Sequence, residues 1–279
     1  WLLKYLPNML ACHVTIVHEC RGPSNTITCC ESSSALSLGE SMRVIERGDA
    51  DACLTGGAES RLNPMALYRQ CCTGRLAETS VDDDPSTILH PFGPDARGTL
   101  LGEGGGILVL ESAETLAARG GRARATLEGF ACTQSFDDDG FGVSAMSLGD
   151  AIHAALDSAD CGPDGIDAIV PFGSSLPAID AGEREALHAT FGDRTASIPT
   201  ICTIPYTGNC TAGNGAIGLC VATAALDAQT LPARLHPGTA VGLDAGACEA
   251  RAHELNRILI TSCSQGGQNT AVVLGRARS

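Results

Sequence analysis

The sequence has few aromatic residues and no C-x-x-C pair, although it contains 14 cysteines. Aromatic residues make up 4% of the 279 residues, whereas hydrophobic residues make up 44% and glycine occurs 33 times. This composition excludes a disordered chain and indicates an interior packed from small side chains. Most cysteines lie in apolar runs such as "GLCVATAAL", where cysteine behaves as a small hydrophobe. We therefore expect reduced thiols, a cytoplasmic setting, no structural zinc site and no cofactor.

The sequence also lacks an excess of positive charge and a long uninterrupted hydrophobic run. Its 18 basic and 32 acidic residues give a net charge of -14. Binding of nucleic acid or an anionic membrane through a broad basic face is thereby excluded. The apolar start "WLLKYLPNMLACHVTIV" contains Lys4, Pro7 and His13 and is too interrupted to span a bilayer. The first residue is Trp1, so we expect a piece of something longer.

Helix-like and strand-like segments alternate along the chain, which predicts an α/β fold with a mostly buried sheet. The segment from Arg61 to Asp95 is expected to be irregular, and its acidic run "VDDDPS" reads as a solvated loop more readily than as a metal site. The pattern restarts near residue 123, which predicts two halves, 1–122 and 123–279. Helices are expected over about 32–47, 148–158, 182–192 and 215–229, and strands within 51–60, 102–111, 166–175 and 256–275.

The stretch "GPSNTITCCESSSALSLGE", residues 22–40, predicts a strand, a tight turn and a helix. This arrangement commonly presents a nucleophile at the turn. Cys29 and Cys30 lie in the approach, but Glu31 stands where the turn opens into the helix. A carboxylate at a helix N-terminus is favoured by the free N–H groups and the helix dipole, which also lower its basicity.

Four motifs in order carry a family resemblance: "RGPSNTI", "GDADACLTGGAES", "HPFGPDARGTLLGEGGGILVLE" and "GGQN". The chain resembles the β-ketoacyl synthases, the thiolase-fold condensing enzymes of fatty acid and polyketide synthesis. The resemblance implies a layered α-β-α-β-α fold over essentially the whole chain. It also implies that the N-terminal third of the family domain is absent, so that residues 1–122 are the remainder of the first half and 123–279 are the second half.

The family carries its nucleophilic cysteine at the strand-to-helix elbow, and the ungapped register from Ser24 to Gly48 places Glu31 there. Because neighbouring strand residues point to opposite faces, Cys30 is expected to point away into packing, and Cys29 to lie lower on the same face. A shifted thiol nucleophile is the less favoured alternative. Since a carboxylate cannot form the acyl thioester, this chain alone is expected not to catalyse condensation.

The resemblance also implies two histidine motifs and a lysine, which this chain has lost. Phe172 stands at the first histidine, Asn209 at the second and Ile204 at the lysine. With Glu31, four groups of the condensing machinery are replaced, so no intact catalytic residue is expected. Other positions retain the scaffold of the site: Asp180, Glu183, Thr207, Gly208, Gly266, Gly267 and Asn269.

The leading hypothesis is therefore a chain length factor, the inactive ketosynthase-like subunit that pairs with an active ketosynthase in type II polyketide systems. In chain length factors the nucleophile is often replaced by glutamine, whereas Glu31 stands at that position here. A buried glutamate needs a partner or stays protonated. The segment "NTITCC" is expected to form the dimer contact, and side chains of "MALYRQCC" to border the chain tunnel. Acyl carrier protein would bind chiefly through the partner, and another chain is one possible source of the missing N-terminal segment.

Two alternatives remain open at this stage. A decarboxylating priming ketosynthase would keep the catalytic histidines, so Phe172 and Asn209 count against it, although Asn209 could donate to an enolate oxygen. A purely structural assembly subunit would lack the tunnel. A plugged interior would favour that subunit, and a continuous apolar lining would favour the chain length factor.

Overall fold

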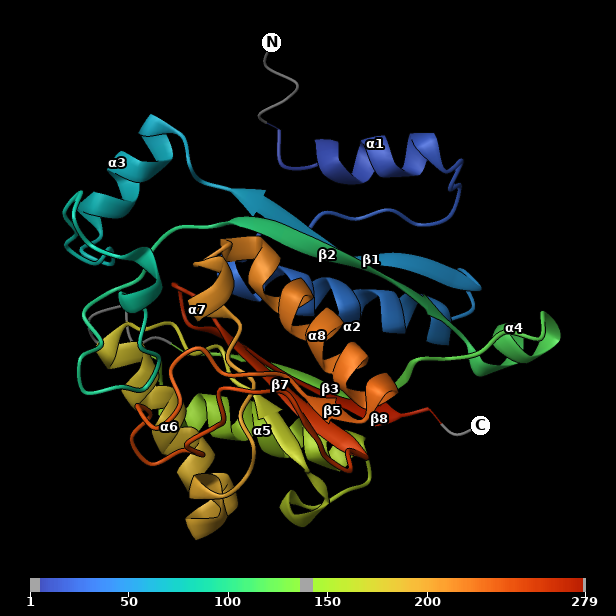
Figure 1. Ribbon diagram of the computed structural model, residues 1–279. Coiled ribbons are helices and arrows are strands. Elements are labelled where there is room, and N and C mark those ends of the chain that lie inside the picture. The colour runs from blue at the N-terminus through green and yellow to red at the C-terminus, as the bar shows by residue number, and fades with distance from the viewer. Residues whose placement is uncertain (1–5, 136–142, 278–279) are drawn as a thin grey trace.

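The computed structural model describes residues 6–135 and 143–277 and shows helices and sheets stacked in layers (Figure 1). The smaller sheet is an antiparallel pair, β1 (Ala52–Ser60) and β2 (Glu103–Glu111). The larger sheet has the order β3-β8-β7-β4, in which only the β4–β7 pair is parallel. Its strands are β3 (Ala125–Gln134), β4 (Ala168–Val170), β7 (Arg257–Cys263) and β8 (Gln268–Arg276).

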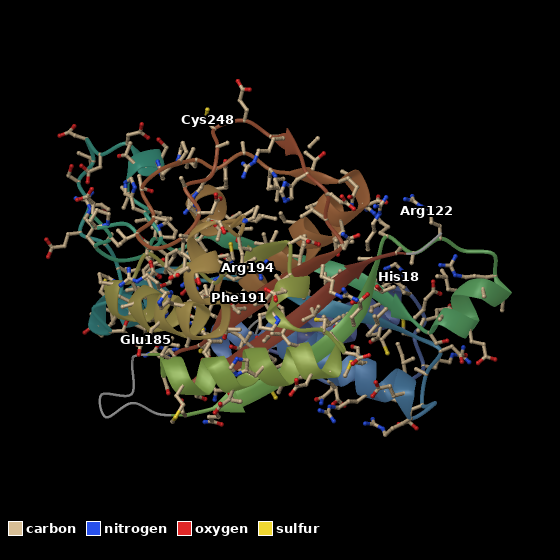
Figure 2. All side chains as sticks on the ribbon, turned by 90° about the horizontal axis from the view of Figure 1, so that it is seen from below. His18, Arg122, Glu185, Phe191, Arg194 and Cys248 are labelled. Atoms are coloured by element: carbon tan, nitrogen blue, oxygen red, sulfur yellow. The ribbon has the colours of Figure 1, made fainter. Side chains whose placement is uncertain are left out.

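Helices lie between the sheets and on both outer sides, which confirms the expected thiolase-like α-β-α-β-α layering (Figure 1). The inner layer is formed by α2 (Ser33–Glu46) and α8 (Asn214–Ala228). The larger sheet is covered on its other side by α5 (Ala145–Ser158) and α6 (Pro177–Phe191), and α5 lies in front of its strands in Figure 2, which views the molecule from below. The short helix α1 (Met9–Val17) lies over the smaller sheet, and none of its residues is buried.

Shorter elements connect these layers. They are α3 (Pro64–Cys72), α4 (Ala113–Ala118), α7 (Ile204–Thr207), β5 (Thr230–Leu231), β6 (Arg251–Ala252) and single 3-10 turns at Cys30–Ser32, Pro85–Thr87, Pro163–Gly165, Gly192–Ala196 and Thr211–Gly213. Within the described residues, no helix combines the length and hydrophobicity that a membrane span requires.

The core lies on the two faces of the larger sheet. One apolar cluster packs this sheet against α5 and α6, with Leu148, Ile152 and Leu187 almost inaccessible to solvent. The other packs it against α2 and α8, around Leu219 and Leu226. β7 and β8 supply buried residues to both clusters because successive strand side chains point to opposite faces. Their near-continuous apolar sequence follows from this double burial.

Three sequence-based expectations need correction. The segment 61–95 is not wholly irregular, because α3 begins at Pro64, where Asn63 caps it by accepting from the N–H of Ala66 at 3.0 Å. The strand predicted within 51–60 forms as β1, but only Thr55 is buried, and the other residues are half-buried or exposed. The segment "NTITCC" makes no strand with any described part of the chain.

Candidate functional site

Glu31 lies in the 3-10 turn Cys30–Ser32, directly before α2 begins at Ser33. Residues from β7 and β8 hold this elbow in place. The hydroxyl of Ser262 donates to the carbonyl of Glu31 at 2.9 Å, and that of Ser32 donates to the carbonyl of Gln268 at 3.0 Å. The elbow is therefore formed locally but attached to the centre of the larger sheet.

The side chain of Glu31 forms a buried ion pair with Arg75. The Nη2 of Arg75 lies 2.7 Å from Oε1 of Glu31, and the two side chains are 9% and 1% exposed. Gln265 completes the cluster, since its N–H donates to Oε2 of Glu31 at 3.3 Å and its side-chain oxygen accepts from Arg75 at 3.2 Å. The carboxylate thus has the partner that its burial requires.

Arg75 is the residue of this site that sequence reasoning missed. It lies 44 residues from Glu31 along the chain, in the segment expected to be irregular. The sequence contained only an indirect signal for this residue. A buried Glu31 requires a cationic partner, but several arginines could supply it, and nothing singled out Arg75. Its Nε is buried and has no hydrogen-bond partner among the described residues.

Asn209, at the position of the second family histidine, lies beside Glu31. Its Nδ2 is 3.5 Å from Oε1 of Glu31, while its Oδ1 accepts from the N–H of Thr211 at 2.8 Å and from Nδ2 of Asn214 at 2.7 Å. The preceding turn is closed by Gly208, which has a φ of 69° and donates to the carbonyl of Ile204 at 2.8 Å. Asn209 thereby links the elbow to the start of α8.

Phe172 and Ile204 line one small void with Thr261 and Ser262 from β7. The void has a volume of about 10 Å³, and the two apolar side chains are 5% and 1% exposed. Neither side chain can donate or accept a proton. Of the four substituted positions, Glu31 and Asn209 are in contact, and the other two line this adjoining void.

The acidic pair Asp180 and Glu183 lies on α6, and both carboxyl groups are buried. Glu183 accepts from the N–H groups of Phe172 and Gly173 at 2.8 and 2.9 Å and from the hydroxyl of Thr261 at 2.6 Å. Four donors surround Asp180: the N–H groups of Phe92, Ser174 and Ser175 and the hydroxyl of Ser174. Together the two residues attach the 172–175 loop to α6.

Burial raises the pKa of both carboxyl groups. It raises the pKa of Asp180 to about 7, against the opposing effect of hydrogen bonds from Phe92 and Ser174, and the neighbouring Glu183 raises it further. Burial also raises the pKa of Glu183, against the effect of its bonds from Thr261 and the two backbone N–H groups. Protonation of this pair is therefore linked to folding.

We predict that the stabilisation contributed by Asp180 falls as the pH rises from about 4 to about 7. Its pKa is about 7 in the folded protein and 3.8 in the reference state, so only the folded chain holds the proton between these values. The stabilisation is complete below pH 4 or so and is lost as the pH rises through about 7, with a slope of about 1.4 kcal/mol per pH unit in between.

The measurement is the free energy of unfolding against pH for the wild type and Asp180→Asn. The difference between the two curves isolates Asp180 from other groups, including His236, whose pKa is lowered by burial and by His90. A wild-type stability that rises relative to the variant over this window would contradict the prediction. It would mean that the four donors keep the carboxylate ionised at low pH.

Cys30, the second cysteine of the approach, lies outside the Glu31–Arg75 cluster. Cys30 has a φ of 47° and borders a cavity beside Arg61 and β1, apart from the Glu31–Arg75 pair; it was expected to point into packing. Burial raises the pKa of its thiol, and the Glu31 carboxylate raises it further, whereas Arg61 lowers it. A raised pKa disfavours the thiolate, which is the nucleophilic form.

The final turn lies between β7 and β8, where Gly266 and Gly267 have φ values of 109° and 83°. These values lie in a region that favours glycine. Asn269 follows in β8, is 1% exposed, and donates from Nδ2 to the hydroxyl of Ser147 at 3.3 Å. The turn carries Gln265 and so places its N–H on Glu31.

This layered fold, with an elbow at the start of a central helix, is the architecture of a condensing-enzyme scaffold. Residues 2–115 match the family model "Beta-ketoacyl synthase, N-terminal domain", and residues 124–237 match "Beta-ketoacyl synthase, C-terminal domain". The chain belongs to the beta-ketoacyl synthase family.

Curated relatives match almost the whole chain. The 3-oxoacyl-[acyl-carrier-protein] synthase 2 of Staphylococcus aureus is 29% identical over 277 residues, covering 96% of this chain and 67% of the relative. The Streptomyces coelicolor protein named actinorhodin polyketide putative beta-ketoacyl synthase 2 is 31% identical, covering 94% of this chain and 64% of its own length. This chain thus spans about two thirds of the length of these relatives.

Solved structures agree with the fold. The ishigamide ketosynthase/chain length factor is 27% identical with a TM-score of 0.84, covering 97% of this chain and 65% of that one. A chain from the AntDE:AntF complex, a type II PKS acyl-carrier protein with its ketosynthase bound to the hexaketide, has a TM-score of 0.89. At 23% identity, covering 98% of this chain and 67% of that one, the second likeness supports the fold alone.

Proposed function

We propose that this chain is a non-condensing ketosynthase-like subunit, a chain length factor, that pairs with an active ketosynthase. The observation that carries the proposal is the buried ion pair of Glu31 with Arg75 at the nucleophile position. A carboxylate held by a guanidinium cannot accept an acyl chain as a thioester. Phe172 and Ile204, at the positions of the first family histidine and the lysine, have side chains that cannot transfer a proton.

The partner would supply the cysteine, and the two chains together would enclose the growing polyketide. The void at Phe172 and Ile204 is too small for an acyl chain, so the tunnel would have to be completed at the interface. Side chains of α3 and its approach are suited to such a surface because they are apolar and exposed: Leu62, Met65, Leu67 and Tyr68. The segment "NTITCC", residues 25–30, is the proposed dimer contact, and its first residues are exposed.

The test is native mass spectrometry of this chain co-expressed with the ketosynthases of its own gene neighbourhood. We expect a one-to-one complex with a cysteine-bearing ketosynthase, and polyketide output that needs both chains. Output should persist in the variant Glu31→Gln, because glutamine keeps an oxygen acceptor for Arg75. If Met65→Trp and Tyr68→Trp border the tunnel, they should shorten the product by one or more extension units.

A purely structural subunit is the second candidate, because the interior at Phe172 and Ile204 is almost filled. In that case the one-to-one complex forms, but the α3 variants leave the product length unchanged. A chain that purifies as a homodimer and releases carbon dioxide from malonyl carrier protein would contradict both candidates. Such a result would favour a decarboxylating ketosynthase, in which Asn209 donates to the enolate oxygen.

A further inference from the structure

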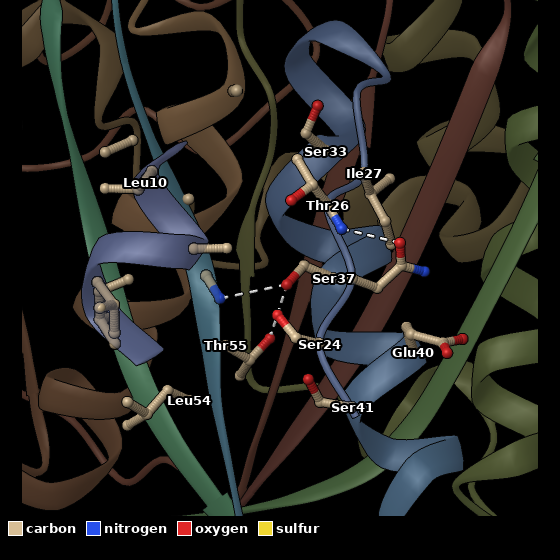
Figure 3. Close-up of a pocket in the computed structure, with 18 of the residues that line it drawn as sticks. Leu10, Ser24, Thr26, Ile27, Ser33, Ser37, Glu40, Ser41, Leu54 and Thr55 are labelled. Atoms are coloured by element: carbon tan, nitrogen blue, oxygen red, sulfur yellow. Dashed lines mark hydrogen bonds between the residues drawn. The ribbon is translucent and has the colours of Figure 1, made fainter. Parts of the chain in front are cut away.

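Two histidines outside the site already described face each other from two loops. The rings of His90 and His236 have centroids 4.4 Å apart and are tilted by 35°. His90 follows the 3-10 turn Pro85–Thr87, and His236 lies between β5 and β6, so the pair joins segments that are distant in the sequence. Neither histidine lines the cavity between α2 and β1 (Figure 3), and the pair is therefore a separate feature of the fold.

The segment that carries His90 is held in place at Phe92. Phe92 has a φ of 60°, which is uncommon for a residue with a side chain and persists only where neighbouring contacts fix it. Its N–H donates to Oδ2 of Asp180 at 2.8 Å, and its carbonyl accepts from the N–H of Val241 at 2.9 Å. Its ring is 2% exposed and lies so close to Gly173 that a Cβ added there would be 3.1 Å away.

The segment 236–241 meets the segment of Phe92 at both of its ends. His236 stacks on His90 at one end, and Val241 donates to Phe92 at the other. Because both contacts join the same two segments, loss of the stacking contact weakens the support of Phe92. It also weakens the support of the loop against which the ring of Phe92 packs.

The hydrogen bonds of the two rings limit how many protons the pair can hold. Nε2 of His90 lies 2.7 Å from the carbonyl of Thr87, so this nitrogen carries a hydrogen and Nδ1 is the atom that gains a proton. Nε2 of His236 is buried and has no hydrogen-bond partner in the described part of the chain. A neutral His236 can leave this nitrogen without a hydrogen, whereas a protonated ring buries an N–H there that has no acceptor.

The pKa of His236 is shifted in the direction that this geometry requires. Burial lowers the pKa, and the neighbouring His90 lowers it further, whereas a hydrogen bond to the Ser86 backbone opposes both. A lowered pKa means that the separated ring takes up a proton more readily than the stacked ring. Separation of the two segments therefore becomes easier as the pH falls below about 6.5.

Charged groups on the surrounding elements do not offset a second proton. Arg234, on the chain of His236, lowers the pKa of that ring, and Arg184 of α6 packs against Gly242. Asp84, at the start of the 3-10 turn, is exposed, so solvent and salt screen its charge. The pKa of Asp180 is raised to about 7 by burial, so this carboxyl group is largely neutral at the pH at which the rings are charged.

We propose that the His90–His236 pair is a pH-dependent contact, which holds segment 236–241 on segment 90–93 while at most one ring is protonated and releases it when both are. Two imidazolium rings at 4.4 Å repel each other, and the two protons are taken up in steps that belong to the pair. Release frees the carbonyl of Phe92 and loosens the loop beside it. The proposal does not depend on the role proposed for Glu31.

The test is hydrogen exchange of the full chain, followed by mass spectrometry at about pH 7.5 and about pH 5.5, with exchange times scaled to the intrinsic rate at each pH. We expect the amides of residues 238–242 and 90–93 to lose about tenfold or more of their protection at the lower pH. Protection of β7 and β8 should stay within about threefold, because the larger sheet does not depend on the pair.

Two variants remove the second charge in different ways. His90→Phe keeps an aromatic ring in the stack that cannot be protonated, and His236→Gln replaces the other ring with a neutral polar side chain. We expect the protection of residues 238–242 in each variant to change by no more than about twofold between the two pH values. His188→Phe is the matched control, since His188 is exposed on α6 and the control keeps both rings of the pair. It should respond as the wild type does.

Three outcomes overturn the proposal. A pH response that persists in both His90→Phe and His236→Gln would assign it to Asp180 or another group. An equal loss of protection in β7 and β8 would mean that the whole fold is destabilised and that no local contact is released. Unchanged protection of residues 238–242 in the wild type would show that the stacked rings accommodate both protons.

Discussion

Replacing Arg75 with methionine is expected to lower the free energy of unfolding by about 3–5 kcal/mol. The substitution leaves the carboxylate of Glu31, which is 1% exposed, without its cation. Gln265 and Asn209 then provide only weak contacts, at 3.3 and 3.5 Å. The measurement is chemical denaturation of the purified chain at neutral pH.

The double variant Glu31→Gln with Arg75→Met should recover most of this loss, because it removes both charges at once. Arg47→Met is the matched control, since Arg47 pairs with Asp49 at 3.0 Å with both side chains about half exposed. A surface pair of this kind contributes about 0–1 kcal/mol. Equal losses from Arg75→Met and Arg47→Met would contradict a buried pair at the elbow.

Replacing Glu183 with leucine is expected to destabilise the protein by about 3 kcal/mol or more. The substitution removes the acceptor of three buried donors, and each unsatisfied donor costs about 1–3 kcal/mol. These donors are the N–H groups of Phe172 and Gly173 and the hydroxyl of Thr261. Their loss would release the loop that carries Phe172 from α6. Chemical denaturation measures the effect, and near-ultraviolet circular dichroism reports the packing of the loop.

Two further variants make this prediction specific. Glu183→Gln keeps one acceptor oxygen, which can still accept from Phe172 and Thr261. It should therefore lower the free energy of unfolding clearly less than Glu183→Leu does. Glu185→Leu is the control on the same helix, because Glu185 is exposed (Figure 2). A surface change of this kind typically stays within about 0.5 kcal/mol. Similar losses for leucine at both positions would argue against a role for the carboxylate of Glu183 in holding the loop.

Elements with strong local signals were predictable from the sequence. The helices at 33–46, 145–158 and 214–228 and the β7–β8 hairpin follow from apolar periodicity and the glycine turn. α3 was missed because it is short and contributes only Gln70 to the buried residues, so its periodicity carries little information. The Asn63-Pro64 capping signal was present in the sequence and could have predicted its start.

The segment 22–28 shows the opposite failure. Its composition is strand-like, but a strand exists only where another backbone offers matching hydrogen bonds, and no described segment does so here. The same dependence on partners explains β1, which forms as predicted because β2 pairs with it along its whole length.

Local sequence by itself determined the longer helices, the β7–β8 hairpin and the turn before α2 that carries Glu31, because these depend on neighbours within a few turns of the chain. Only the tertiary structure decided that Glu31 is paired with Arg75 and that Phe172 and Ile204 fill the adjoining space. Burial, charge pairing and empty volume arise from residues distant in sequence. They are properties of the packed chain, which no local pattern specifies.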